Sequence, residues 1–163
     1  MKNSETPTIE QDISDWIVAN YPELVYDDIN EMYWDCPNGW REVVESTIQT
    51  LALLNKVTTG ARVGICQIKQ KFGELRIYVD FSDTENDPNY NDFRKLIYNI
   101  ITYAEHQCEK TCESTGKYGV LCSRGGWLRT LHPRVAKETG YIPLSRNREL
   151  YSELSEEIPT EDL

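Results

Sequence analysis

Residues 62–81 read RVGICQIKQKFGELRIYVDF, and this stretch decides the fold. Two runs rich in β-branched residues flank Gln70-Lys71-Phe72-Gly73, so we expect strands at Arg62–Lys69 and Glu74–Phe81 joined as a hairpin. In the second run apolar side chains alternate with polar ones, which is typical of a strand with one buried face and one polar face. The predicted architecture is therefore built around this hairpin.

Helical periodicity appears on both sides of the hairpin. Apolar residues recur at helical spacing from Ile9 to Ile17, from Trp40 to Leu54 and from Phe93 to Cys108. Tyr21-Pro22 is expected to end the first helix, and Asn38 to cap the second. The pattern predicts an α+β protein in which helices pack on a small, mainly antiparallel sheet.

The region after Cys112 predicts short elements. Its glycines indicate strands near 118–122 and 127–131, and Pro133 and Gly140 bracket one short helix. A chain of 163 residues is long enough to bury a core as one domain. We expect that domain at 9–148, between a disordered N-terminus at 1–8 and an acidic segment at 149–163 that is either a tail or a weak helix with an acidic surface.

The chain is acidic overall, with 27 acidic and 17 basic residues and a formal net charge of −10. Net negative charge repels nucleic acids and anionic membranes, so neither is expected as a partner. No apolar run is long enough to span a bilayer, the N-terminus shows no apolar signal segment, and five cysteines make an odd count. These features predict a cytosolic protein with reduced thiols.

Positive charge is confined to two segments of the chain. Residues 62–76 hold four basic residues and one acid, and residues 110–137 hold six basic residues and one acid. By contrast, residues 1–45 hold eleven acids and two bases, and residues 149–163 hold six acids and no base. The sequence thus combines acidic ends with a positive middle.

In the hairpin, alternate residues share a strand face. Gln67, Lys69 and Lys71 therefore lie on one face, and Arg76 and Tyr78 share a face of the partner strand, so a suitable register would gather them into one patch. Such a patch suits a phosphate-bearing ligand, because Arg offers a bidentate fork, Lys a point charge and Tyr a flat apolar surface. Ordinary solvated strand residues would give the same pattern.

The second basic segment adds glycines to the cations. In Gly116-Lys117-Tyr118-Gly119 and Arg124-Gly125-Gly126-Trp127, backbone amides could approach an anion closely. Neither motif has the spacing of a P-loop. Turns that simply need glycine explain the same residues equally well.

Metal binding and catalysis find little support in the sequence. Cys108, Cys112, Cys122 and His132 are candidate ligands, but Thr115 stands where a zinc knuckle would place its second cysteine. We interpret the cysteines as structural, and expect no metal and no cofactor. With only two histidines and no serine in a nucleophile-elbow setting, the sequence does not predict an enzyme.

Five motifs occur together: Gly39-Trp40, the run Gln67–Tyr78 (Gln-x-Lys-x-Lys-Phe-Gly-x-Leu-Arg-x-Tyr), Ala104-Glu105, Cys112–Gly119 and Arg124–Leu131. In this combination residues 38–143 resemble a widespread family of small phage and prophage proteins. Many members of that family carry a Cys-x-x-Cys knuckle followed by a later Cys and His, as a zinc site would.

The resemblance implies a C-terminal hairpin like that of a zinc ribbon, in degenerate form. Cys112 matches the first ligand position, whereas Thr115, His132 and Val135 stand at the other three. The chain is therefore similar to a branch of the family that lacks the zinc ligands.

Together these observations predict a binding site of cations, aromatic rings and hydrogen-bonding groups. Phosphates would contact the six basic residues Lys69, Lys71, Arg76, Lys117, Arg124 and Arg129. Stacking surfaces would come from Trp40, Phe72, Tyr78 and Trp127, and hydrogen bonds from Gln67 and Thr130. The expected ligand is an anionic, nucleotide-like small molecule, and a homo-oligomer with shared pockets is a further expectation.

Three functions remain open at this point. The first is a phage-encoded, non-catalytic protein that sequesters a nucleotide immune signal, either a cyclic dinucleotide or an ADP-ribose derivative, in the cytosol of the infected bacterium. This hypothesis rests on an analogy of pocket chemistry with proteins that absorb such signals. The second is an acidic inhibitor or DNA mimic that binds a host nuclease or defence protein, and the third is a small nucleotide hydrolase.

Overall fold

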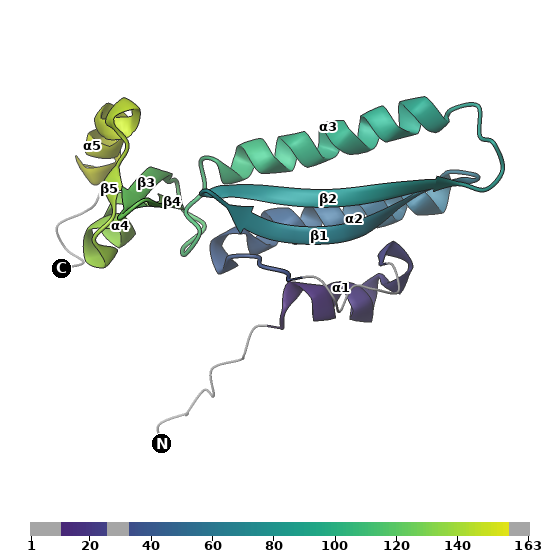
Figure 1. Ribbon diagram of the computed structural model, residues 1–163, viewed down its shortest axis with the longest axis horizontal. Helices are drawn as coiled ribbons and strands as arrows, with labels where there is room; N and C mark the ends of the chain where they lie inside the picture. The colour runs from purple at the N-terminus through teal and green to yellow at the C-terminus, as the bar shows by residue number, and fades with distance from the viewer. Residues whose placement is uncertain (1–10, 26–32, 157–163) are drawn as a thin grey trace, which may run out of the picture.

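A computed structural model of the protein describes residues 11–25 and 33–156 (Figure 1). Their fold is α+β, as predicted, and the strands are divided between two antiparallel sheets. One sheet is the hairpin of β1 (Ala61–Lys71) and β2 (Glu74–Asp83). The other has the order β4-β3-β5, in which β3 is Val120–Arg124, β4 is Trp127–Leu131 and β5 is Ile142–Pro143.

The central hairpin is longer than the sequence predicted and its turn is tighter. Only Phe72-Gly73 lies between the strands, and both residues have positive φ angles, 55° and 78°. That backbone matches the right-handed twist of the flanking strands. The register places Lys69 opposite Arg76, with one irregularity between Ile65 and Gln67.

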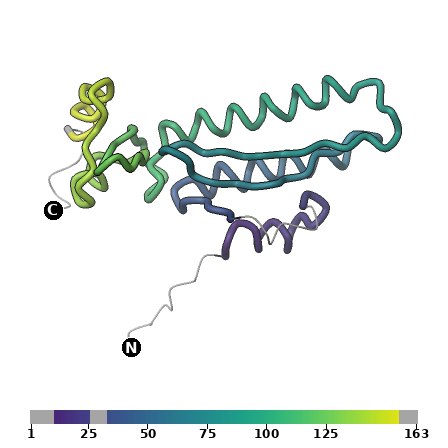
Figure 2. The backbone as a smooth tube through the Cα atoms, viewed as in Figure 1, coloured from purple at the N-terminus to yellow at the C-terminus, as the bar shows by residue number. Residues whose placement is uncertain are grey.

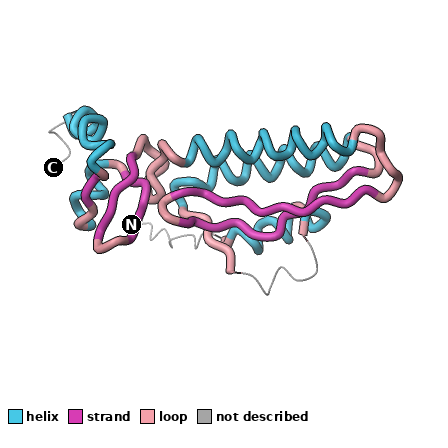
Figure 3. The backbone as a smooth tube through the Cα atoms, turned by 45° about the horizontal axis from the view of Figure 1, so that its top comes forward, coloured by secondary structure: helices cyan, strands magenta, loops and turns pink. Residues whose placement is uncertain are grey.

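Two long helices, α2 (Arg41–Val57) and α3 (Tyr90–Cys108), lie side by side on one face of the hairpin (Figure 3). A first hydrophobic core fills the space between them, because the apolar stripe of each helix points at the strands. Burial of each large side chain contributes roughly 1.5–3 kcal/mol. Fully buried members of this core include Ile48, Leu51, Ile68, Leu75 and Ile97.

The N-terminal helix α1 (Ile13–Asn20) adds Ile13 and Ile17 to the same core. It starts later than the predicted position, because the Asp12 side chain caps it by accepting a 2.8 Å hydrogen bond from the Ser14 amide. Ile9 and the expected disordered segment 1–8 lie outside the described residues.

The C-terminal sheet has its own smaller core. Cys112, Val120, Cys122, Leu131, Ala136 and Tyr141 are buried there, covered by α4 (Pro133–Thr139) and α5 (Arg148–Glu156). Figure 2 shows the chain leaving the end of α3 and entering this second half of the molecule. The stretch expected as one domain thus contains two cores. None of the described helices has the length and apolarity needed to cross a bilayer.

One sequence-based expectation needs correction. Asn38 does not cap α2: it begins a short 3-10 turn, Asn38–Trp40, and α2 has no side-chain cap. Of the two alternatives for the acidic C-terminal segment, the helix is found up to Glu156, because Tyr151 and Leu154 have apolar surface to pack against in the second core. The remainder of the tail, 157–163, lies outside the described residues.

Candidate functional site

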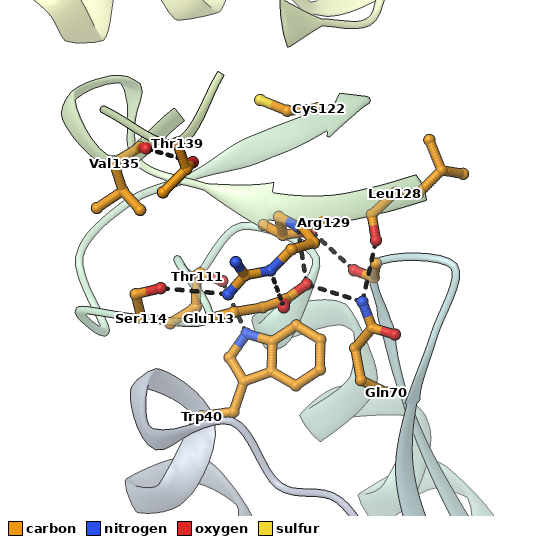
Figure 4. A network of polar contacts seen from close by, with 12 residues as sticks. Trp40, Gln70, Thr111, Glu113, Ser114, Cys122, Leu128, Arg129, Val135 and Thr139 are labelled. Carbon is orange, nitrogen blue, oxygen red and sulfur yellow. Dashed lines mark hydrogen bonds and ion pairs between the residues drawn. The ribbon is translucent and has the colours of Figure 1, made fainter. Parts of the chain in front are cut away.

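The two halves of the molecule meet where the turn before α2 touches the start of the C-terminal half. The Gly39 amide donates a 2.7 Å hydrogen bond to the Glu113 carbonyl, and Trp40 Nε1 donates a 2.8 Å bond to the Thr111 carbonyl (Figure 4). A Cβ atom on Gly39 would overlap the backbone of Cys112 and Glu113. The Gly-Trp motif is therefore explained by this close contact.

Glu113 is the centre of the junction, although its side chain is only 3% exposed. Its Oε1 accepts hydrogen bonds from Gln70 Nε2 (3.1 Å) and the Thr130 amide (2.9 Å), and its Oε2 accepts from Arg129 Nε (3.0 Å) (Figure 4). Gln70 Nε2 also lies 3.0 Å from the Leu128 carbonyl. A buried carboxylate with three donors is well satisfied, and here it ties β1 to β4.

A groove of about 1050 Å³ opens beside this junction. Its walls come from three parts of the chain: the segment before α2, the tip of the central hairpin and the β3–β4 turn. The lining residues are Asp35, Pro37, Asn38, Gln70, Lys71, Phe72, Glu113, Ser114, Gly125, Gly126, Trp127, Leu128, Arg129 and Tyr141. We call it the junction groove.

Two large aromatic side chains of the junction groove are exposed. Phe72 is 67% exposed and lies in the β1–β2 turn, and Trp127 is 73% exposed and begins β4, directly after the β3–β4 turn. Phe72 also adopts a φ of 55°, which a bulky residue rarely does. Neither ring is required by a core, so both are available to a ligand.

Charges in the junction groove are nearly balanced. Arg129 is paired with Glu113, and its Nη2 lies 3.3 Å from Ser114 Oγ. The Lys71 ammonium lies 5.6 Å from the centre of the Phe72 ring and forms no ion pair with a described residue. Burial raises the pKa of Asp35, opposed by the nearby Arg129 charge. Lys71 and Asp35 are thus the two charged groove side chains that form no ion pair and no hydrogen bond with a described residue.

The structure brings some of the predicted site residues together. Lys71 and Phe72 from the hairpin and Trp127 and Arg129 from the C-terminal sheet line the same groove. The two basic segments therefore converge, and these four are the predicted site residues that line the junction groove.

A second group of predicted residues lies on the open face of the hairpin, opposite the helices. Lys69 and Arg76 are direct cross-strand partners, and the Lys69 ammonium lies 5.2 Å from the centre of the Tyr78 ring. Arg76 forms an ion pair with Glu74. The predicted shared face is real, yet Arg76 is already paired with Glu74 and none of these residues lines the junction groove.

Three of the predicted ligand contacts need correction. Trp40 is 0% exposed, so its ring packs in the core and offers no stacking surface. Gln67 is buried and donates a 2.7 Å hydrogen bond to the Tyr33 carbonyl. Thr130 is buried and donates a 2.8 Å hydrogen bond to the Gly73 carbonyl, so it fixes the hairpin tip.

The last two predicted residues lie behind or away from the groove. Arg124 donates a 2.6 Å hydrogen bond to the Thr139 carbonyl, with its guanidinium 4.6 Å from the centre of the Tyr141 ring. It supports a groove wall without lining the groove. Lys117 is exposed on the turn before β3, where its charge acts on His132.

The four candidate metal ligands do not form a cluster. Cys108 belongs to the first core, whereas Cys112 and Cys122 belong to the second. Burial raises the pKa of Cys108 to about 12 and that of Cys122 to about 11, which keeps both thiols protonated. Among residues 11–25 and 33–156, no three His, Cys, Asp or Glu side chains are placed to hold a metal ion.

Four of the groove residues that sequence reasoning missed are Glu113, Gln70, Asp35 and Tyr141. Glu113 had a signal, since it is the only acid between Lys110 and Lys137. Gln70 was assigned to a loop, although it belongs to β1. Asp35 and Tyr141 had no local signal, because only tertiary packing brings them to the groove.

The fold and the groove define a small two-core α+β protein with an aromatic-rimmed cleft at the junction of its halves. No protein-family model, curated protein or solved structure matches the chain.

Proposed function

We propose that this protein binds an anionic, nucleotide-like small molecule in the junction groove and releases it unchanged. In an infected bacterial cytosol it would withhold a nucleotide immune signal, a cyclic dinucleotide or an ADP-ribose derivative, from a defence effector. The phage setting rests on the family resemblance of residues 38–143. The observation that carries the binding proposal is the pair of exposed aromatic rings beside an unpaired lysine in one groove.

The aromatic rim supports a ligand with a flat ring. Stacking of one base on an aromatic side chain contributes about 1–3 kcal/mol. Phe72, in the β1–β2 turn, and Trp127, at the start of β4, would provide such surfaces. The unfavourable φ of Phe72 strengthens the argument, since strained residues cluster at ligand sites.

The charge of the groove supports a compact anion. Lys71 is free to meet a phosphate, and Arg129 keeps part of its guanidinium exposed although Glu113 holds its Nε. The chain's net charge of −10 disfavours long polyanions at the same time. A small nucleotide is thereby favoured over DNA or RNA.

Binding without turnover is supported by how the polar groove residues are used. The carboxylate of Glu113 is occupied by three donors, and Ser114 Oγ accepts a hydrogen bond from Arg129. These groups therefore hold the groove in shape. A second copy of the chain could close the open side of the groove, which sedimentation with and without ligand would reveal.

The test begins with the ligand itself. The purified protein is incubated with lysate from bacteria that are producing an immune nucleotide, then denatured, and the released small molecules are identified by mass spectrometry. Calorimetry with a panel of cyclic dinucleotides and ADP-ribose derivatives follows. Absence of any retained nucleotide together with absence of heat would refute the proposal, and loss of intact ligand during long incubation would indicate a hydrolase.

Matched variants locate the site. Trp127→Ala and Lys71→Ala should each weaken nucleotide binding by about tenfold or more. Tyr103→Ala, which removes an exposed aromatic ring from α3, and Lys137→Ala, on α4, should leave binding unchanged. Equal effects of groove and control variants would contradict a site in the junction groove.

One observation favours a second function, binding of a basic protein. On α5, Tyr151 and Leu154 pack against the second core, whereas Glu149 and Glu153 are exposed. An acidic helix face of this kind could cover a basic surface, as an inhibitor of a host nuclease would. Glu149→Gln with Glu153→Gln should then abolish inhibition while Trp127→Ala has no effect.

A further inference from the structure

Two side chains of opposite charge in the junction groove, Lys71 and Asp35, form no ion pair and no hydrogen bond with a described residue. Lys71 is the last residue of β1. Asp35 lies beside the same strand, where its backbone amide donates a 2.9 Å hydrogen bond to the carbonyl of Ile68, three residues before Lys71. At about 3.3 Å per strand residue, roughly 10 Å of backbone separates these two points. Both side chains line the groove.

We propose that Asp35 is the residue that selects the ring of the ligand, and that it selects guanine. This inference rests on the proposed function and narrows its ligand to a guanine-containing cyclic dinucleotide, because an ADP-ribose derivative carries adenine. A carboxylate only accepts hydrogen bonds, so it suits a ring edge with two adjacent donors. Guanine presents such an edge through N1–H and its 2-amino group, whereas adenine presents an acceptor beside a donor.

The surroundings of Asp35 favour this role. Its carboxylate is half-buried and forms no hydrogen bond with a described residue, so an arriving donor pair would find an unsatisfied acceptor. Burial raises the pKa of Asp35, although the nearby Arg129 charge opposes the shift. A donor pair from guanine would supply hydrogen bonds to this half-buried carboxylate.

The spacing of the two charges fits the same ligand. With guanine at Asp35, the 5′-phosphate of an extended nucleotide points along β1 toward Lys71. The aromatic rings of Phe72 and Trp127 line the same groove. An acceptor for the edge, two aromatic surfaces for the ring and a cation for the phosphate of one guanine nucleotide are thus present in one groove.

Calorimetry with three nucleoside monophosphates tests the assignment. GMP should bind the wild-type protein about tenfold to a hundredfold more tightly than AMP. IMP, which lacks the 2-amino group, should fall between them. Asp35→Asn keeps the size of the side chain but mixes a donor with an acceptor, so it should remove the preference. Asp15→Asn, on the exposed side of α1, is the matched control and should retain it.

The outcomes separate this inference from the function on which it rests. If GMP and AMP bind equally, or if the preference survives in Asp35→Asn, the role of Asp35 is overturned while nucleotide binding stands. If none of the probes binds and the wider nucleotide panel is also silent, both fail. Thermal unfolding of Asp35→Asn, expected to match the wild type, guards against a folding artefact.

Discussion

The two hairpin turns that border the junction groove share a backbone conformation but differ in their residues. Both have positive φ at both positions: 55° and 78° at Phe72-Gly73, and 55° and 86° at Gly125-Gly126. At the β3–β4 turn glycine occupies both positions, and a Cβ atom there would meet open space. At the β1–β2 turn a phenylalanine occupies the first position.

Glycine at the β3–β4 turn is explained by its backbone conformation, whereas phenylalanine at the β1–β2 turn is not. A left-handed conformation costs a residue with a Cβ about 1–2 kcal/mol, which glycine avoids. The β3–β4 turn follows that rule. The β1–β2 turn departs from it at the position whose exposed ring lines the groove, which is the pattern expected if Phe72 serves the proposed binding.

Loss of Glu113 should have the largest effect, because its carboxylate holds the strands of the two turns together. Glu113→Ala removes the acceptor of three hydrogen bonds and leaves the Thr130 amide and Arg129 unpaired. We expect a loss of about 3 kcal/mol in the free energy of unfolding, measured by urea denaturation. Glu138→Ala, which removes an exposed partner of Arg134, should change it by less than about 0.5 kcal/mol. Similar losses in the two variants would show that Glu113 does not join the halves.

Alanine at one glycine of each turn compares the turns directly. Gly73→Ala combines a positive φ with an overlap between the new Cβ and the Leu121 side chain, so it should cost about 2 kcal/mol or more. Gly126→Ala has the positive φ alone and should cost about 1 kcal/mol. Urea denaturation of both variants measures the difference. A greater loss for Gly126→Ala would reverse our view of which turn is packed.

Phe72→Asn tests the claim that this turn gives up stability for binding. Asparagine tolerates the left-handed conformation and precedes glycine in favourable hairpin turns, so the free energy of unfolding should rise by about 1 kcal/mol. Nucleotide binding should weaken in the same variant, because a stacking surface is gone. Lower stability in Phe72→Asn would mean that the ring supports the fold after all.

The sequence was sufficient for the elements that depend on local pattern. Alternation predicted both strands of the central hairpin, and helical periodicity predicted α2 and α3. The sequence predicted a four-residue connection between the strands, residues 70–73, but the turn has only two residues. Turn rules do not anticipate a phenylalanine such as Phe72 in a left-handed position.

The site was harder to predict than the fold. The cations and aromatic rings in the sequence indicated a binding surface, and two of these residues, Lys71 and Trp127, line the same groove. It could not show that Trp40 is buried or that Glu74 neutralises Arg76, since both depend on packing. Asp35 reaches the groove only because its backbone pairs with the edge of β1, a contact that leaves no trace in the local sequence.

The smallest expected effect is a pH dependence of stability that is confined to α4 and does not extend to α2. His132 follows β4 and caps α4, where its Nδ1 accepts a 3.3 Å hydrogen bond from the Arg134 amide. Burial, with the charges of Lys117 and Arg134, lowers the pKa of His132 below its ordinary value of 6.5. The folded state therefore binds fewer protons than the unfolded state between that lowered pKa and 6.5, so stability falls as the pH falls through this window.

Protonation also removes the acceptor that caps the helix, a loss of about 1 kcal/mol or less. Hydrogen exchange should show the amides of α4 opening more readily at pH 5.5 than at pH 8, while those of α2 keep their protection. His132→Asn retains a capping oxygen without the titration, so it should abolish the change. Persistence of the acid effect in that variant would place its origin elsewhere. Asp35 and Glu105 cannot cause a loss of stability at low pH, because burial raises the pKa of both carboxyl groups. Their protonation at low pH therefore favours the folded state.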